Sequence, residues 1–257
     1  METVREIKKA LIFDQYLDLL GGGERYSLTF AQQLAALGYD VEVAWKDGQI
    51  LKEAEKRFGL NLSKITLNPQ AYINCSQKIS IIKKFQFTRK YETIFWVSDG
   101  SIPFLFSPKS FVHLQVPFLK LGGNRLTNSI KSFFIKKFVY NSEFTKSIHE
   151  KNLNSNKSFV LYPPVDVASL KPGFKEKIIL SVARFSSVLT SKRQDLLIDA
   201  FRLFSDKISG FKLVMVGGLV GDSTIISTLK NQAQGLNVEI VANPSFENLK
   251  NLYTKST

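Results

Sequence analysis

The sequence has little of the chemistry that builds disulfides, metal clusters or membrane spans. Its single cysteine, Cys75, cannot form an internal disulfide or a thiolate cluster, which fits a reducing cytosolic setting. No apolar run approaches the ~18 residues that cross a bilayer, and the first 13 residues lack the pattern of a signal peptide. The two histidines, His113 and His149, have no partner at metal-ligand spacing. We therefore expect neither a metal nor a bound cofactor.

Acidic residues are scarce in one long stretch. The chain carries 35 Lys and Arg against 22 Asp and Glu, a net charge of +13. Residues 78–157 hold 14 of the basic residues and four acidic ones, a local net charge of +10. A concentrated positive field favours a polyanionic partner, either membrane phospholipid or nucleic acid. The alternative is a lysine-rich surface that serves solubility alone.

Short β-branched or aromatic runs alternate with helical segments, a pattern typical of parallel strands joined by crossover helices. Two consecutive prolines, Pro163 and Pro164, interrupt it, because they fit neither a helix interior nor a central strand. Alternation then restarts with KIILSV at residues 177–182. The pattern predicts an α/β protein with two Rossmann-like doubly wound domains, residues 1–165 and 166–257, the second incomplete. Strands are expected at residues 10–14, 41–45, 93–97, 110–114, 138–141, 159–162, 177–182, 212–216 and 238–241, and helices at residues 24–37, 49–58, 124–137, 143–152, 191–204, 223–234 and 246–253.

A glycine-rich turn, Gly21, Gly22 and Gly23, follows the first predicted strand and precedes a helix. Consecutive glycines let a backbone approach a ligand closely, and a helix N-terminus favours a phosphate or a developing anion. The spacing is neither GxGxxG nor a P-loop, which argues against a dinucleotide or ATP site. A plain turn is the alternative interpretation.

Two cations, Arg184 and Lys192, lie after the strand at residues 177–182 and at the start of the next helix. Fixed cations at the carboxyl end of a parallel strand are suited to a pyrophosphate, since Arg offers a planar fork and Lys a point charge. They can also offset the negative charge that grows on a diphosphate leaving group. Taken alone, an Arg and a Lys near a strand end are more often solvated surface residues.

The two histidines have different surroundings. His113 ends a predicted buried strand, where ligand clefts open in α/β sheets. A core histidine held by a backbone carbonyl is the alternative for it. His149 lies beside Glu150 and Lys151 in a predicted helix, and we expect it to be exposed.

Six short strings follow one another along nearly the whole chain. They are GGGER at residues 21–25, VYNSEFT at 139–145, YPPVD at 162–166, SVARF at 181–185 followed by KRQDLLIDAF at 192–201, VGG at 216–218 and NPS at 243–245. In this order they resemble the retaining, family-four glycosyltransferases of the GT-B fold. VSDGS at residues 97–101, together with Val112 and His113, is similar to the branch that includes lipid-linked oligosaccharide mannosyltransferases.

The resemblance implies metal-independent transfer of a sugar, with retention, from a nucleotide-sugar (a UDP- or GDP-sugar) to a glycan or lipid-linked acceptor. It implies that Arg184 and Lys192 bind the donor diphosphate and that the glycine-rich turn lies over donor and acceptor. It also implies that His113 lies beside a hydroxyl of the transferred sugar. The E-x7-E motif of the family lies beyond residue 245, and the chain ends before reaching it. The sequence therefore predicts a C-terminally truncated enzyme. Ala183 stands where the family has a glycine.

Residues 124–138 combine apolar side chains at helical spacing, among them Leu126, Ile130 and Phe133, with Arg125 and several lysines. Such a helix can lie on anionic lipid or serve as an ordinary crossover helix. We expect the aromatics to pack in the core and the lysines to face a membrane, which implies a cytoplasmic protein, peripheral on the inner face. The competing hypotheses are a basic nucleic-acid-binding module, for which no motif is present, and a fragment that binds a nucleotide without turnover.

Overall fold

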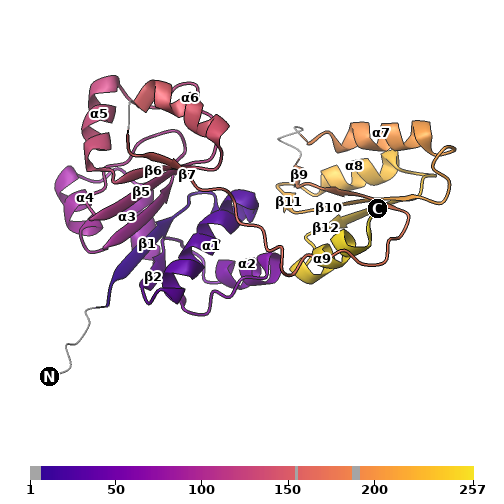
Figure 1. The fold of residues 1–257 in the computed structure, drawn as a ribbon, viewed down its shortest axis with the longest axis horizontal. Helices are drawn as coiled ribbons and strands as arrows, with labels where there is room; N and C mark the ends of the chain where they lie inside the picture. The colour runs from indigo at the N-terminus through magenta and orange to yellow at the C-terminus, as the bar shows by residue number, and fades with distance from the viewer. Residues whose placement is uncertain (1–6, 154–155, 187–191) are drawn as a thin grey trace. The chain divides into compact units, whose positions relative to one another are not determined.

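The computed structural model describes residues 7–153, 156–186 and 192–257 (Figure 1). The chain divides into two compact units. The first comprises Met1–Asp18, Gly22–Glu53 and Leu60–Pro164, and the second comprises Leu19–Gly21, Ala54–Gly59 and Val165–Thr257.

The first unit is built on a parallel sheet whose order in the described residues is β3-β2-β1-β4-β5-β6-β7. The chain winds outward from β1 in one direction through β2 and β3, and in the other through β4 to β7 (Figure 1). The register sets Phe13 beside Trp96, and Val97 beside His113. All carboxyl ends therefore meet at one edge of the sheet. The strands are β1 (Lys9–Phe13), β2 (Asp40–Val43), β3 (Ile65–Leu67), β4 (Thr93–Val97), β5 (Lys109–Leu114), β6 (Lys137–Tyr140) and β7 (Ser158–Val160).

Helices connect these strands, and several begin at side-chain caps. The side chains of Asn68, Ser80 and Asn124 accept hydrogen bonds from backbone N–H groups in the first turns of α3, α4 and α5. The short 3-10 turn η1 (Leu17–Leu19) precedes the first helix. The helices between these strands are α1 (Gly22–Ala36), α2 (Ile50–Phe58), α3 (Pro69–Ser76), α4 (Ile81–Thr88), α5 (Arg125–Phe134) and α6 (Glu143–Leu153), of which α2 is divided between the two units at Glu53.

The sheet of the first unit has an apolar layer on each face. On one face a large cluster joins the strands to α3, α4 and α6, with Ala71, Phe87 and Leu153 from the helices. On the other face α1 covers β4 and β5, where the ring of Phe30 stacks on Phe95 with centroids 4.3 Å apart. His113 points to this second face and lies beneath α1.

The second unit has a smaller parallel sheet of order β12-β10-β8, with β9 and β11 as a separate short pair at its carboxyl edge. Helices α7 and α8 pack on it around Phe185, Ile198 and Met215. Its elements are β8 (Ile178–Val182), β9 (Phe185–Ser186), α7 (Gln194–Phe204), β10 (Lys212–Gly217), β11 (Leu219–Val220), α8 (Thr224–Gln232), β12 (Val238–Ala242) and α9 (Phe246–Lys255).

The predicted α/β class with parallel sheets in both parts is confirmed. The elements η1, β3, α3, α4, β9 and β11 were not predicted, and the predicted start of α7 at residue 191 lies outside the described residues. The helix predicted over residues 124–137 ends at Phe134, because Ile135 is extended and fully buried in the core.

Core packing of the aromatics in residues 124–138 is correct for Phe138 and wrong for Phe133 and Phe134, the latter 38% exposed. Phe138 lies in β6 and is fully buried, whereas Phe133 of α5 is 76% exposed. Helical periodicity shows that apolar residues share a face, but it does not show which way that face points.

Candidate functional site

Arg184 directly follows β8, at the carboxyl edge of the second sheet. Two backbone hydrogen bonds hold the chain on either side of it: the N–H of Ala183 donates to the carbonyl of Val216 (2.9 Å), and that of Phe185 donates to Gly218 (2.7 Å). The path of Arg184 is thereby tied to the end of β10. A half-buried arginine on a fixed backbone at this edge is suited to binding an anion.

Gly217 makes this close approach possible. A Cβ at residue 217 would overlap the carbonyl oxygen of Ala183, so only glycine lets the ends of β8 and β10 pass so near each other. Asn243, with φ of 51°, joins the end of β12 to the same place. Its N–H donates to the Gly217 carbonyl (2.8 Å), and its Oδ1 accepts from the N–H of Leu219 (2.9 Å). The NPS string thus has a structural role at this edge.

Lys192 lies just before α7 and is exposed. The side chain of Gln194, the first residue of α7, donates to the Arg184 carbonyl (2.9 Å), so the start of this helix is fixed next to the Arg184 segment. Arg193 pairs with Asp195, with Nη2 and Oδ2 2.8 Å apart. Within the described residues, neither Arg184 nor Lys192 forms an ion pair. Both charges therefore remain for a ligand.

The glycine-rich turn leads into α1, which begins at Gly22. A Cβ at Gly23 would collide with the side-chain amide of Gln115, the residue that follows β5. The amide of Asn141, after β6, in turn donates to the Gln115 carbonyl (2.9 Å). The first turn of α1 therefore lies close to the Gln115 side chain after β5, at the carboxyl edge of the first sheet.

Asp14 is a buried carboxylate at this edge that sequence reasoning passed over. It follows β1 directly and is fully buried; its oxygens accept from the N–H of Tyr16 (3.1 Å) and the hydroxyl of Ser27 (2.9 Å). Burial raises its pKa, since desolvation outweighs these hydrogen bonds. The available signal was an acidic residue that ends an apolar strand just before a glycine-rich turn.

His113 lies within the core, 1% exposed. Its ring stacks on Tyr26 of α1, with centroids 4.4 Å apart and planes 3° apart, and its Nδ1 is 3.2 Å from the carbonyl of Val139. Burial lowers the pKa of His113 to about 4, so the ring is neutral near pH 7. Because Nδ1 faces Val139, contact with a sugar would have to come through Nε2. The role of His113 at the sugar stays a prediction.

The prediction that His149 is exposed is wrong. The side chain is fully buried, with Nε2 2.8 Å from the carbonyl of Val116 and the ring stacked on Tyr140 at a centroid distance of 5.6 Å. His149 and Thr145 are four residues apart and both buried, so they lie on the face of α6 that packs on the sheet. Its charged sequence neighbours point elsewhere.

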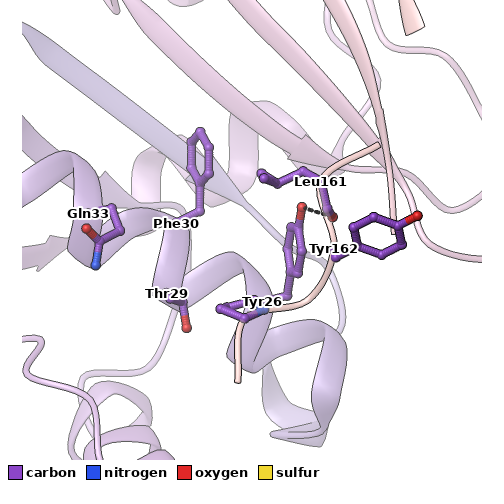
Figure 2. Close-up of a pocket in the computed structure, with 7 residues that line it drawn as sticks. Tyr26, Thr29, Phe30, Gln33, Leu161 and Tyr162 are labelled. Atoms are coloured by element: carbon purple, nitrogen blue, oxygen red, sulfur yellow. Dashed lines mark hydrogen bonds between the residues drawn. The ribbon is translucent and has the colours of Figure 1, made fainter. Parts of the chain in front are cut away.

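A pocket on the first unit lies between α1 and the segment after β7 (Figure 2). The hydroxyl of Tyr26 donates to the Leu161 carbonyl across it (2.9 Å), and the remaining walls are largely apolar. Neither His113 nor the glycine-rich turn lines it. Such a lining is unsuited to a phosphate. The lining residues are Tyr26, Thr29, Phe30, Gln33, Leu161, Tyr162 and Pro164.

The predicted site residues therefore fall into two sets. Arg184 and the start of α7, next to Lys192, meet at the carboxyl edge of the second sheet, whereas His113 and the glycine-rich turn belong to strand and helix ends of the first. Among the described residues no group of three or more His, Cys, Asp or Glu is placed to hold a metal ion. No described helix has the length and apolarity that crossing a bilayer requires.

Comparisons with solved structures support the fold. The chain is similar to a glycosyltransferase from Rickettsia africae, with a TM-score of 0.63 and 19% identity over 97% of this chain and 72% of that one. It is also similar to TarM, with a TM-score of 0.63 and 11% identity over 98% and 79% of the two chains. A third similar structure is MnaA of S. aureus, solved with UDP, with a TM-score of 0.56 and 12% identity over 98% and 73%.

At these identities the likeness is one of fold. No family model matches the sequence, and no curated protein matches it. The prediction of a GT-B fold built from two Rossmann-like domains is confirmed. The chain has the fold of the GT-B glycosyltransferases.

Proposed function

We propose that this chain is a nucleotide-sugar glycosyltransferase whose second unit binds the donor diphosphate at the carboxyl edge of its sheet. One observation carries the proposal: Arg184 stands on a backbone fixed by the ends of β8 and β10 and by Gln194 of α7, with no carboxylate among the described residues paired to it. A fixed, uncompensated guanidinium at such an edge suits a diphosphate.

The chemistry of sugar transfer explains why two cations belong here. When the bond between the sugar and the diphosphate breaks, its electron pair stays on the diphosphate oxygen. Arg184 and Lys192 stabilise that growing negative charge, and they do so more in the transition state than in the ground state. The N-terminus of α7 adds a partial positive charge of the same sign. This arrangement supports departure of the leaving group without a metal ion.

The finer assignment follows the family-four resemblance. We propose retention of configuration, a UDP- or GDP-sugar as donor, mannose as the sugar, and a lipid-linked or polysaccharide acceptor at a membrane surface. In this proposal Gly21, Gly22 and Gly23 lie on the acceptor side, and Nε2 of His113 contacts a hydroxyl of the sugar. UDP in the similarly folded MnaA supports testing UDP first.

Calorimetry of the full chain with UDP, GDP and ADP tests the diphosphate site. Arg184→Ala removes a charge-assisted contact worth about 1.5–3 kcal/mol, so we expect the dissociation constant to rise about 10- to 100-fold. Lys230→Ala, which removes one exposed positive charge from α8, is the matched control and should bind as the unmodified chain does. Equal binding by the chain and its Arg184→Ala variant would remove the assignment of this residue.

The same titration repeated in EDTA tests metal independence. We expect unchanged nucleotide affinity, because the proposed site offsets the phosphate charge with side chains and a helix N-terminus. A loss of affinity that Mg²⁺ or Mn²⁺ restores would instead assign a metal to the diphosphate. Release of the nucleoside diphosphate from a sugar donor, measured in parallel, separates binding from turnover.

A further inference from the structure

Helix α5 presents its apolar side to solvent and its polar side to the protein. Leu126 and Phe133 are 72% and 76% exposed, and Ile130 and Phe134 lie on the same face, 48% and 38% exposed. None of the residues of α5 is buried. The partly covered positions are polar instead: Thr127, Asn128, Lys131 and Ser132. A helix that folded only to bury its apolar face would be turned the other way.

Helix α4 also exposes apolar side chains, although Phe87 on its other side is buried in the core. Ile82 is 67% exposed, and Ile81 and Phe85 beside it are 49% and 44% exposed. Lys84 is turned inward, where Nζ donates to the Asn74 carbonyl (3.1 Å). Two neighbouring helices thus expose aliphatic and aromatic side chains while burying part of a lysine.

A chain of aromatic contacts joins the two helices. Phe106, in the loop between β4 and β5, packs edge-on against Phe85 of α4 and against Phe134 of α5, with centroids 5.2 and 4.8 Å away. Phe133 continues the series, 5.4 Å from Phe134. Figure 1 shows α4 and α5 at the same end of the first unit. We call this continuous region the α4–α5 surface, defined by Ile81, Ile82, Phe85, Leu126, Ile130, Phe133 and Phe134.

The segments that form the α4–α5 surface carry positive charge alone. No Asp or Glu occurs in residues 78–91 or 100–142, which include both helices and most of the loop between β4 and β5. A contiguous apolar region larger than scattered single residues marks an interaction site. Basic residues around an apolar face are the combination that binds anionic lipid. The exposed basic residues are Lys78, Lys83, Arg89, Lys90, Arg125 and Lys136.

We propose that the α4–α5 surface docks on an anionic phospholipid bilayer, with Ile82, Leu126 and Phe133 entering the interface and the surrounding lysines and arginines meeting lipid phosphates. The aliphatic side chains favour lipid over nucleic acid. Nucleic-acid bases stack on aromatic side chains, but they provide no apolar phase in which Ile or Leu side chains could be buried. Lys157 holds the end of α5 in place: its Nζ donates to the carbonyls of Ser132, Phe133 and Ile135, at 3.1, 2.9 and 2.9 Å.

Co-sedimentation of the full chain with vesicles tests the proposal. Binding is expected to phosphatidylcholine vesicles that contain phosphatidylglycerol, to weaken with salt, and to be absent with phosphatidylcholine alone. Ile82→Ala with Phe133→Ala should weaken it at least about tenfold, from lost apolar burial. Leu37→Ala, equally exposed at 75% but just after the end of α1, is the matched control and should have no effect.

A separate pair of variants tests the contribution of the basic residues to vesicle binding. Lys83→Gln with Lys136→Gln should weaken binding by about 5-fold per residue, and Lys52→Gln with Lys64→Gln, exposed on the same unit outside the surface, should not. A Phe133→Trp variant reports insertion directly: its emission shifts to the blue on anionic vesicles, while the native Trp45 and Trp96 are already buried.

Three results would overturn the proposal. The first is equal binding to neutral and anionic vesicles, and the second is loss of binding in the control pairs. The third is no vesicle binding together with self-association or RNA binding that the same variants abolish, since the surface would then serve a protein or a nucleic acid. The Arg184→Ala variant should bind vesicles normally, so failure of the nucleotide site and failure of this surface are separable.

Discussion

The burial of His113 makes the stability of the first unit depend on pH. Its pKa falls from the usual 6.5 to about 4 in the folded chain because its ring lies under α1. A basic group whose folded pKa is depressed contributes stability that is present above the unfolded pKa and lost as pH falls through the folded one. The loss therefore occurs between about pH 6.5 and pH 4.

The size of this loss follows from the shift. Each pKa unit corresponds to 1.36 kcal/mol, so a fall from 6.5 to about 4 removes about 3 kcal/mol between pH 7 and pH 4. Asp14 acts in the opposite direction, because its folded pKa is raised and its contribution is lost as pH rises. A comparison of the chain with a His113 variant cancels this shared contribution.

Urea unfolding at pH 7 and pH 4 measures the effect. Both tryptophans, Trp45 and Trp96, lie in the first unit, so their fluorescence reports that unit. His113→Phe keeps an aromatic ring against Tyr26 and removes the titration. We expect the variant to lose about 3 kcal/mol less than the unmodified chain between the two pH values. Equal losses, within 1 kcal/mol, would refute the assignment of the shift to His113.

Two further substitutions test the contacts that hold the proposed diphosphate site and the α4–α5 surface in place. Gly217→Ala places a methyl group against the Ala183 carbonyl and should destabilise the second unit by about 1–3 kcal/mol, with a lower melting temperature and weaker nucleotide binding. Lys157→Met removes three charge-assisted donations to the end of α5 and should cost about 1.5–3 kcal/mol, seen in urea unfolding and faster amide exchange in α5.

Each of these changes has a matched control. Gly48→Ala is free of steric conflict, because nothing lies within 4 Å of the added Cβ, and should leave the melting temperature unchanged. Lys64→Met removes an exposed lysine that caps no described helix and should leave α5 exchange unchanged. A Gly217→Ala chain as stable as the Gly48→Ala chain would contradict the close approach of β8 and β10. Unaltered exchange in the Lys157→Met chain would contradict the role of Lys157.

Long elements were predictable from the sequence because each carries a strong local pattern. KIILSV predicted β8, and the helix after the glycine-rich turn became α1 with a start two residues earlier. The region from β3 to α4 was missed, although Asn68 and Pro69 form a helix start signal. Helices α3 and α4 have eight residues each, too few turns for periodicity to stand out.

The sequence predicted where the site residues lie along the strands and helices, but not their burial or their hydrogen-bond partners. Arg184 was expected at a strand end and is found there, but the backbone bonds that fix it join residues from Ala183 to Gly218, which no local pattern brings together. His149 shows the same limit, because its charged neighbours pointed outward while its own side chain packs on the sheet. Long-range pairing decides these environments.

Folding alone does not explain why α5 turns its apolar side chains toward solvent. This helix is held by polar contacts: the Asn124 cap, the Asn128 amide on the Gly122 carbonyl (3.0 Å) and the Lys157 ammonium on its last turn. None of these hydrogen bonds uses the side chain of Leu126 or Phe133. Because the two side chains are 72% and 76% exposed, they contribute little apolar burial to the stability of the first unit. Replacing them with polar residues should leave folding intact. Their apolar character is therefore explained by a partner outside the chain, and the positive charge around them indicates that this partner is anionic.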